Sequence, residues 1–122
     1  MTVVGLMVAG AAGAVLRYLV DRYVQGKVAS GFPSGTLVIN VTGSLVLGVL
    51  TGSALHHGLS ATWVTVLGTG LIGAYTTFST FTYDSFRLLG SDGMATALTN
   101  ILVSVVAGLG AAVAGIALGT LI

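Results

Sequence analysis

The chain has 122 residues, of which 55% are hydrophobic and only 6% are Asp, Glu, Lys or Arg, against about 25% in an ordinary soluble domain. A soluble protein of this size must cover most of its surface with polar groups, so this composition, with a mean hydropathy of +1.06, excludes a soluble enzyme and a disordered chain. The formal net charge of +1 provides no attractive surface for nucleic acid, and the lack of cysteine excludes disulfides and thiolate-bound metals.

The charged residues leave three long uncharged segments, at residues 1–16, 28–83 and 93–122. A membrane-spanning helix needs about 20 mainly apolar residues, and a polar turn at 54–60 divides the longest segment into two such lengths. We therefore predict an all-α membrane protein with a single transmembrane domain over residues 1–122. Its four predicted helices span residues 2–23, 34–55, 61–89 and 94–121.

Two other structures for the apolar segments fit the sequence less well. A secretory signal peptide starts with a basic region, but no Lys or Arg precedes Arg17. A β-barrel needs strands that alternate between apolar and polar residues, whereas these apolar runs are continuous. Helices are therefore the predicted elements.

In the first helix, Arg17 follows 16 uncharged residues. A charged group at membrane depth is costly and by default suggests a function. Arg17 has two interpretations: it extends its side chain to the interface or forms a structural hydrogen bond, or it stands at the mouth of a pore and attracts anions.

In the second helix, Thr36, Asn40 and Ser44 repeat every four residues and so share one face. The simpler interpretation is a hydrogen bond between helices, which contributes about 0.6 kcal/mol within a membrane. The alternative is that these polar side chains line an ion pathway.

The third helix contains the strongest signal, because seven of the eleven residues Gly73–Tyr83 carry a hydroxyl group. Thr and Ser compete for backbone hydrogen bonds, so the helix is predicted to break near 73–80. Freed carbonyls in such a break could hold a cation, and freed amides an anion. Phe78 and Phe81 lie on one face and could turn their positive ring edges to an anion, or simply pack against glycines.

The fourth helix repeats the four-residue polar spacing at Thr96, Asn100 and Ser104. Two matching stripes on two helices suggest a polar track between them. Three small-residue pairs permit close helix packing, and the excess of small residues suggests an oligomer. These pairs are Ala9/Gly13, Gly48/Gly52 and Gly115/Gly119.

The remaining polar residues suggest no other chemistry. His56 and His57 are predicted in a solvated turn, and Asp84 is predicted to face water or to pair with Arg87. No nucleophile has a plausible base nearby, so the chain is predicted not to be an enzyme. Arg22, Lys27 and Arg87 share one side of the membrane, which the positive-inside rule places in the cytoplasm. This small bias is also compatible with insertion in both orientations.

Four blocks of the sequence carry a resemblance to a known family, and the third, ending in Thr-Thr-Phe-Ser-Thr-Phe, is highly specific. The chain resembles the Fluc (CrcB-type) fluoride channels over essentially its whole length. The four blocks are Gly10–Tyr18, Gly35–Gly43, Gly73–Phe81 and Asn100–Ser104.

The resemblance implies an antiparallel, dual-topology dimer in the plasma (inner) membrane, in contact with membrane lipid. It implies passive export of cytoplasmic fluoride through two pores at the dimer interface. It also implies a structural Na⁺ at the dimer centre, held by the backbone carbonyls of Gly73 and Thr76 of both subunits. The implied fluoride pathway consists of Arg17, Asn40, Phe78, Ser79, Thr80, Phe81 and Ser104.

The sequence departs from the family at two points. Asn100 stands where the fourth helix of the family often has a tyrosine, and Gly73-Ala74-Tyr75 replaces a glycine-richer stretch.

We expect a homodimer, with a heterodimer of two oppositely oriented homologues as the alternative. Composition and spacing alone do not name fluoride, so two other functions stay open. One is a small four-helix multidrug-type transporter, although residues 1–16 lack the acidic residue of that class, and the other is a non-conducting membrane assembly subunit.

Overall fold

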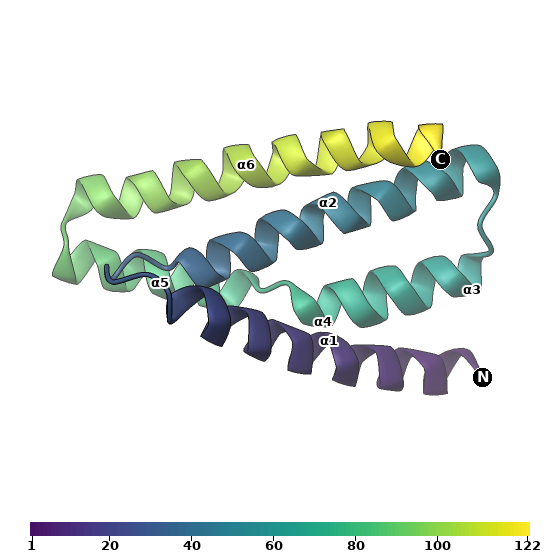
Figure 1. Ribbon diagram of the computed structural model, residues 1–122, viewed down its shortest axis with the longest axis horizontal. Helices are drawn as coiled ribbons and strands as arrows, with labels where there is room; N and C mark the ends of the chain where they lie inside the picture. Colours follow the sequence, from purple (N-terminus) through teal and green to yellow (C-terminus); the bar gives the residue numbers. More distant parts are fainter.

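The computed structural model describes residues 1–122, and it contains only helices and the loops between them (Figure 1). Three of the helices are long and apolar enough to cross a membrane. These three are α1 (Thr2–Gln25), α2 (Ser34–His57) and α6 (Met94–Leu121).

The predicted third helix is a divided segment. Its first half runs through α3 (Ala61–Trp63), the π-helix η1 (Val64–Ile72) and α4 (Gly73–Tyr75), and its second half is α5 (Phe78–Ser91). Only Thr76 and Thr77 separate the two halves, which follow one another along the length of the molecule (Figure 1). The chain thus has four helical segments, and the break falls within the stretch of Thr and Ser residues.

One sequence prediction is wrong at the end of α2. His56 and His57 lie in the last turn of this helix, not in the following loop. Gly58 is the first residue to leave the helix, with φ of 69°, a left-handed conformation that ends helices at glycine. Histidine is also compatible with a helix C-terminus, where the macrodipole is negative.

Two glycine pairs form the tight contact between α2 and α6. A Cβ atom at Gly48 would meet the carbonyl of Ala112, and one at Gly115 would meet the carbonyl of Leu45. Gly52 and Gly119 repeat this reciprocal contact one turn further along. Because glycine has no side chain, the two backbones approach closely enough for extensive van der Waals contact.

The third small-residue pair, Ala9/Gly13, also packs within the chain. Gly70 of η1 lies against Ala9, and a Cβ at Gly13 would meet the carbonyl of Leu71. All three pairs thus contact helices of the same chain. They supply no argument for an oligomer.

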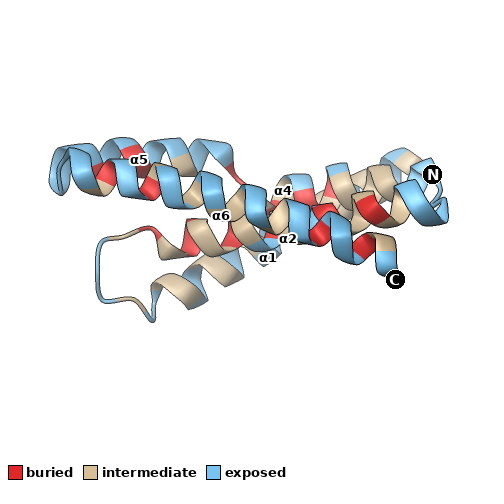
Figure 2. Ribbon diagram, turned by 90° about the horizontal axis from the view of Figure 1, so that it is seen from above, coloured by how far each residue is buried: buried red, intermediate tan, exposed pale blue.

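The chain buries little of itself. Only 19 of 122 residues are buried, in short stretches on the inward faces of the helices (Figure 2). Most large apolar side chains point outward, among them Val4, Met7 and Leu102, which are each more than 60% exposed. An outer surface of this kind requires lipid or another protein surface around it.

The α2–α6 contact predicts a sharp difference between two substitutions on α6. Gly115→Ala should lower the free energy of unfolding by about 1–3 kcal/mol, because its methyl group would press on the backbone of α2. Gly110→Ala is the control, because a Cβ there has no neighbour within 4 Å. Thermal unfolding in detergent, followed by circular dichroism, measures both, and equal melting temperatures for the two variants would contradict the packing described.

Candidate functional site

The break between α4 and α5 consists of two extended threonines. Thr76 has ψ of 160°, and Thr77 has φ of −149° and ψ of 119°. Thr77 then caps α5, because its Oγ1 accepts a hydrogen bond from the Thr80 amide at 3.2 Å. The β-branched residues that weaken a helix here also supply the hydroxyl that starts the next one.

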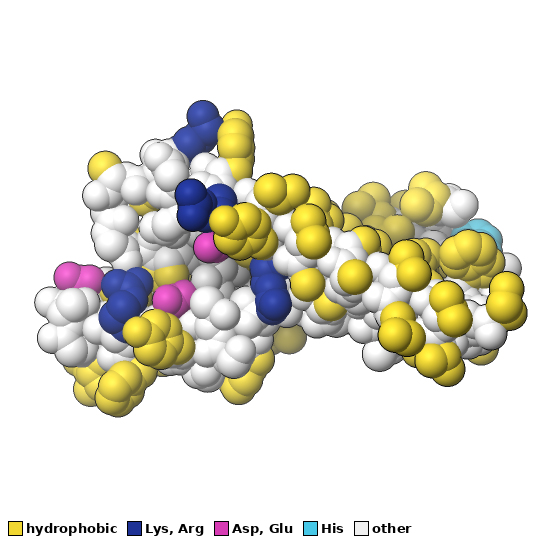
Figure 3. Space-filling view, turned by 90° about the horizontal axis from the view of Figure 1, so that it is seen from below, with side chains coloured by type: hydrophobic (Ala, Val, Ile, Leu, Met, Phe, Trp, Pro, Cys, Tyr) yellow, Lys and Arg dark blue, Asp and Glu magenta, His cyan; other side chains and the backbone are white.

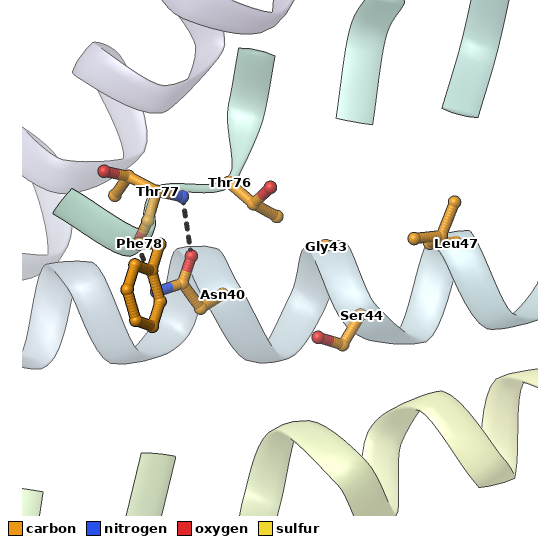
Figure 4. Close-up of a pocket in the computed structure, with 7 residues that line it drawn as sticks. All are labelled: Asn40, Gly43, Ser44, Leu47, Thr76, Thr77 and Phe78. Carbon is orange, nitrogen blue, oxygen red and sulfur yellow. Dashed lines mark hydrogen bonds between the residues drawn. The ribbon is translucent and has the colours of Figure 1, made fainter. Parts of the chain in front are cut away.

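Asn40 of α2 closes the break from the side. Its Nδ2 donates to the Thr77 carbonyl at 2.9 Å, and its Oδ1 accepts from the Thr77 amide at 2.8 Å (Figure 4). The side-chain amide thus satisfies both backbone groups of one residue. The predicted hydrogen bond between helices is therefore present, and Asn40 also borders a cavity, as described below.

The same hydrogen bonds free two backbone carbonyls. In a continuous helix, the amide of Thr77 would donate to the Gly73 carbonyl and that of Thr80 to the Thr76 carbonyl. Here these amides donate to Asn40 and to the Thr77 hydroxyl. Gly73 and Thr76 are the residues whose carbonyls the sequence resemblance implied as Na⁺ ligands.

Arg17 of α1 reaches this region. Its Nη1 donates to the Thr76 carbonyl at 3.4 Å, so a cationic group already contacts one of the two freed oxygens. Arg17 is partly buried and also borders a polar cavity. Of its two interpretations, the structural hydrogen bond is present, and its position beside a cavity is compatible with the other.

Three polar cavities follow one another along this face. The first, of about 240 Å³, lies between α2 and the break and is bordered by Asn40, Ser44, Thr76, Thr77 and Phe78 (Figure 4). A second, of about 340 Å³, lies on the other side of Thr77, and a third, of about 300 Å³, adjoins it through a shared wall. Polar residues of the second are Arg17, Asp21, Thr36, Thr77, Ser79 and Thr80, and the third shares Asp21, Thr36 and Thr80 with it.

The sequence analysis missed a buried pair beside the third cavity. Thr36 donates its hydroxyl to Oδ2 of Asp84 at 2.9 Å, and Asp84 is only 9% exposed. Arg87 lies 3.8 Å from the other carboxylate oxygen, so the predicted pairing is present. The other alternative, that Asp84 faces water, does not apply, because the residue is buried and bonded to Thr36 of α2. Thr36 belongs to the polar stripe of α2, which was the available signal for a partner.

The two phenylalanines lie side by side but have different surroundings. Their ring centroids are 5.8 Å apart with a tilt of 48°. Phe78 borders the first cavity and is 76% exposed, whereas Phe81 faces an apolar cavity between α5 and α6.

The polar stripe of α6 does not join that of α2. Asn100 is 2% exposed and donates to the Ser85 hydroxyl of α5 at 2.9 Å. Ser104 makes no side-chain hydrogen bond and borders none of the cavities described. The predicted track between α2 and α6 is therefore not formed within one chain, because Asn100 is bonded to α5 and not to the stripe of α2.

Comparison with known proteins identifies the family of the chain. A family model described as "CrcB-like protein, Camphor Resistance (CrcB)" matches residues 4–116. The chain belongs to the CrcB family. All four sequence blocks that carried the resemblance lie within the matched residues.

Curated CrcB relatives cover nearly the whole chain. It is 52% identical to the fluoride-specific ion channel FluC 1 of Streptomyces avermitilis, over 91% of this chain and 90% of the relative. It is 48% identical to FluC 2 of Mycobacterium tuberculosis H37Rv, over 92% of this chain and 86% of the relative, which is also named a fluoride-specific ion channel. These names and the three apolar helices establish a multi-pass membrane protein of a channel family, not an enzyme.

In this CrcB protein, the break should depend on the Asn40 amide. Asn40→Ala removes both partners of the Thr77 backbone, and each buried polar group left unpaired costs about 1–3 kcal/mol. We expect hydrogen exchange of the Thr77 amide to accelerate about tenfold or more. Ser44→Ala alters the same cavity without removing a hydrogen bond and is the control. NMR exchange rates in detergent measure both, and an unchanged Thr77 rate in Asn40→Ala would refute the bracing role.

Proposed function

We propose that this chain forms a fluoride-selective channel, through which fluoride leaves the cytoplasm passively down its gradient. The observation that carries this proposal is the polar cavity beside the helix break, bordered by Asn40, Thr77 and Phe78, in a chain 52% identical to a protein named a fluoride-specific ion channel. Fluoride holds its water tightly, so a pathway for it must offer close hydrogen-bond donors. Selectivity then follows from pore width and donor placement.

The side chains along the cavities can supply such donors. The Asn40 amide has two N–H groups, and the Thr77 carbonyl takes only one of them. Hydroxyl groups of Ser44, Ser79 and Thr80 follow along the cavities. Arg17 adds a positive charge beside the second cavity, and the ring edge of Phe78, which borders the first cavity, carries partial positive charge toward an anion. Phe81 faces an apolar cavity and is included in the pathway on the strength of the family resemblance. We include Ser104 in the pathway only on the strength of the family resemblance.

We further propose an antiparallel, dual-topology dimer with two pores along its interface. Support comes from α5, where Phe78, Ser79 and Thr80 are exposed on the single chain at the depth of the break. Hydroxyl groups facing lipid are unfavourable, so a second subunit that covers them would stabilise the protein. Lys, Arg and Asp side chains lie toward one end of the molecule and histidine toward the other (Figure 3). This one-sided charge is the feature that favours the alternative, a heterodimer with an oppositely oriented homologue.

A structural Na⁺ at the dimer centre completes the proposal. Its ligands would be the Gly73 and Thr76 carbonyls of both subunits. The amides that would bond these carbonyls in a continuous helix, those of Thr77 and Thr80, donate to other groups here. Unwound carbonyls at membrane depth are known ligands for Na⁺. The ion would supply positive charge that holds the two helix breaks together.

The first experiment is ion efflux from liposomes that contain only this purified chain. A fluoride electrode follows fluoride, and chloride is followed in parallel. Rapid fluoride loss without chloride loss supports a selective channel made of one chain type. Loss of both ions would contradict selectivity, and no efflux from folded protein would contradict a homomeric channel.

Phe78→Ala should lower fluoride efflux at least tenfold, because it removes the aromatic edge of the first cavity. Phe86→Ala is a matched control on the same helix, since Phe86 is 75% exposed against 76% for Phe78 and borders a different, apolar cavity. Cross-linking or size-exclusion chromatography checks that both variants assemble. Equal efflux from Phe78→Ala and wild type would count against the assigned pathway.

Dual topology can be tested directly because the chain has no cysteine. Ser30→Cys places one thiol in the exposed loop between α1 and α2 without changing any charge. An impermeant maleimide added outside intact cells should label about half of the molecules if both orientations occur. Labelling of none or of all molecules would instead indicate one fixed orientation and a heteromeric partner.

A further inference from the structure

Tyr75 is the last residue of α4 before the break, and it is almost fully buried. Only 7% of its surface is exposed, yet its hydroxyl lies 2.9 Å from Oγ1 of Thr42 on α2. A buried tyrosine hydroxyl needs a hydrogen-bond partner, and Thr42 provides it.

The direction of this hydrogen bond follows from the other bond of Thr42. A threonine hydroxyl has a single proton, and that of Thr42 points to carbonyls of its own helix, Val38 at 2.7 Å and Ile39 at 3.2 Å. Oγ1 of Thr42 is therefore the acceptor, and the Tyr75 hydroxyl is the donor. Phenylalanine at position 75 would remove this bond and leave the ring packing in place.

This bond completes a clamp on the break. From α2, Asn40 holds the backbone of Thr77 and Thr42 holds the side chain of Tyr75, so the residues on both sides of Thr76 are fixed to one helix. Next to Thr42 in the same helix, Gly43 also faces the break. A Cβ there would meet Cγ2 of Thr76 and lie 3.3 Å from Cδ1 of Tyr75.

We propose that the Tyr75 hydroxyl is a positioning group that, through Thr42, sets the orientation of the Thr76 carbonyl and hence the Na⁺ affinity of the break. The proposal rests on the function proposed above, in which this carbonyl is a Na⁺ ligand. Tyr75 itself touches neither ion. Its effect passes along the backbone of Thr76, the next residue, to a carbonyl that Arg17 also contacts.

The test is fluoride efflux from liposomes as a function of Na⁺ concentration, with N-methylglucamine replacing Na⁺. In Tyr75→Phe, the Na⁺ concentration for half-maximal efflux should rise about threefold, as expected for the loss of one average hydrogen bond within a membrane protein. Efflux at saturating Na⁺ should stay within about twofold of wild type. Tyr83→Phe is the control, since Tyr83 is 66% exposed and its hydroxyl makes no hydrogen bond.

Substitutions at Thr42 separate positioning from general stability. Thr42→Val should raise the Na⁺ requirement as Tyr75→Phe does, and Thr42→Ser, which keeps the hydroxyl, should behave as wild type. Because both changes remove the same bond, the double variant Tyr75→Phe/Thr42→Val should shift no further than either single variant. An additive shift would overturn the pairing of these two residues.

Thermal unfolding in detergent, with Na⁺ or N-methylglucamine, gives a readout that does not depend on flux. Stabilisation by Na⁺ should be smaller in Tyr75→Phe than in wild type. An unchanged Na⁺ requirement in Tyr75→Phe would overturn the inference and leave the proposed channel intact. If neither fluoride efflux nor thermal stability of the wild type depended on Na⁺ concentration, the proposed Na⁺ site would be overturned and, with it, this role of Tyr75.

Discussion

A backbone polar group inside a membrane needs a partner from the protein itself, because lipid offers none. This constraint decides the form of the helix break. The two threonines can leave the helix only because Asn40 bonds both backbone groups of Thr77 and the Thr77 hydroxyl bonds the amide of Thr80. Side chains thus take over the amides of Thr77 and Thr80, and the carbonyls of Gly73 and Thr76 lose the partners that they would have in a continuous helix.

Helix α2 connects this break to the rest of the chain. At one end of the helix, Asn40, Thr42 and Gly43 contact the two sides of the break. Towards the other end, Gly48 and Gly52 lie against the backbone of α6. Since the glycine contact has no side chains that could change rotamer, α2 has little freedom to move against α6. Because α2 is held in this way, the residues of the break that bond to it are also held in place.

The sequence allowed the helix break and the polar stripe of α2 to be predicted, but not the residues that each polar side chain contacts on other helices. The cluster of β-branched and hydroxyl residues predicted the break because their competition for backbone hydrogen bonds is a local effect. The four-residue stripe on α2 likewise marked Thr36, Asn40 and Ser44. Which residues these would meet depends on how the helices pack, so the Thr36–Asp84 bond and the burial of Asn100 against Ser85 were not foreseen. Helix α2 ends two residues beyond the predicted end, because Gly58 and not the polar pair His56-His57 terminates it.

The placement of small and large residues also shapes how the chain meets its surroundings. Several of its glycines lie where its own helices touch, and helices that meet through glycine leave almost no space between them. Its outer faces carry Phe, Leu, Val and Tyr side chains instead. When two surfaces with such large side chains pack together, the ends of the side chains make the contacts and gaps remain between them. In the dimer proposed above, narrow ion-sized passages could therefore persist between the two subunits.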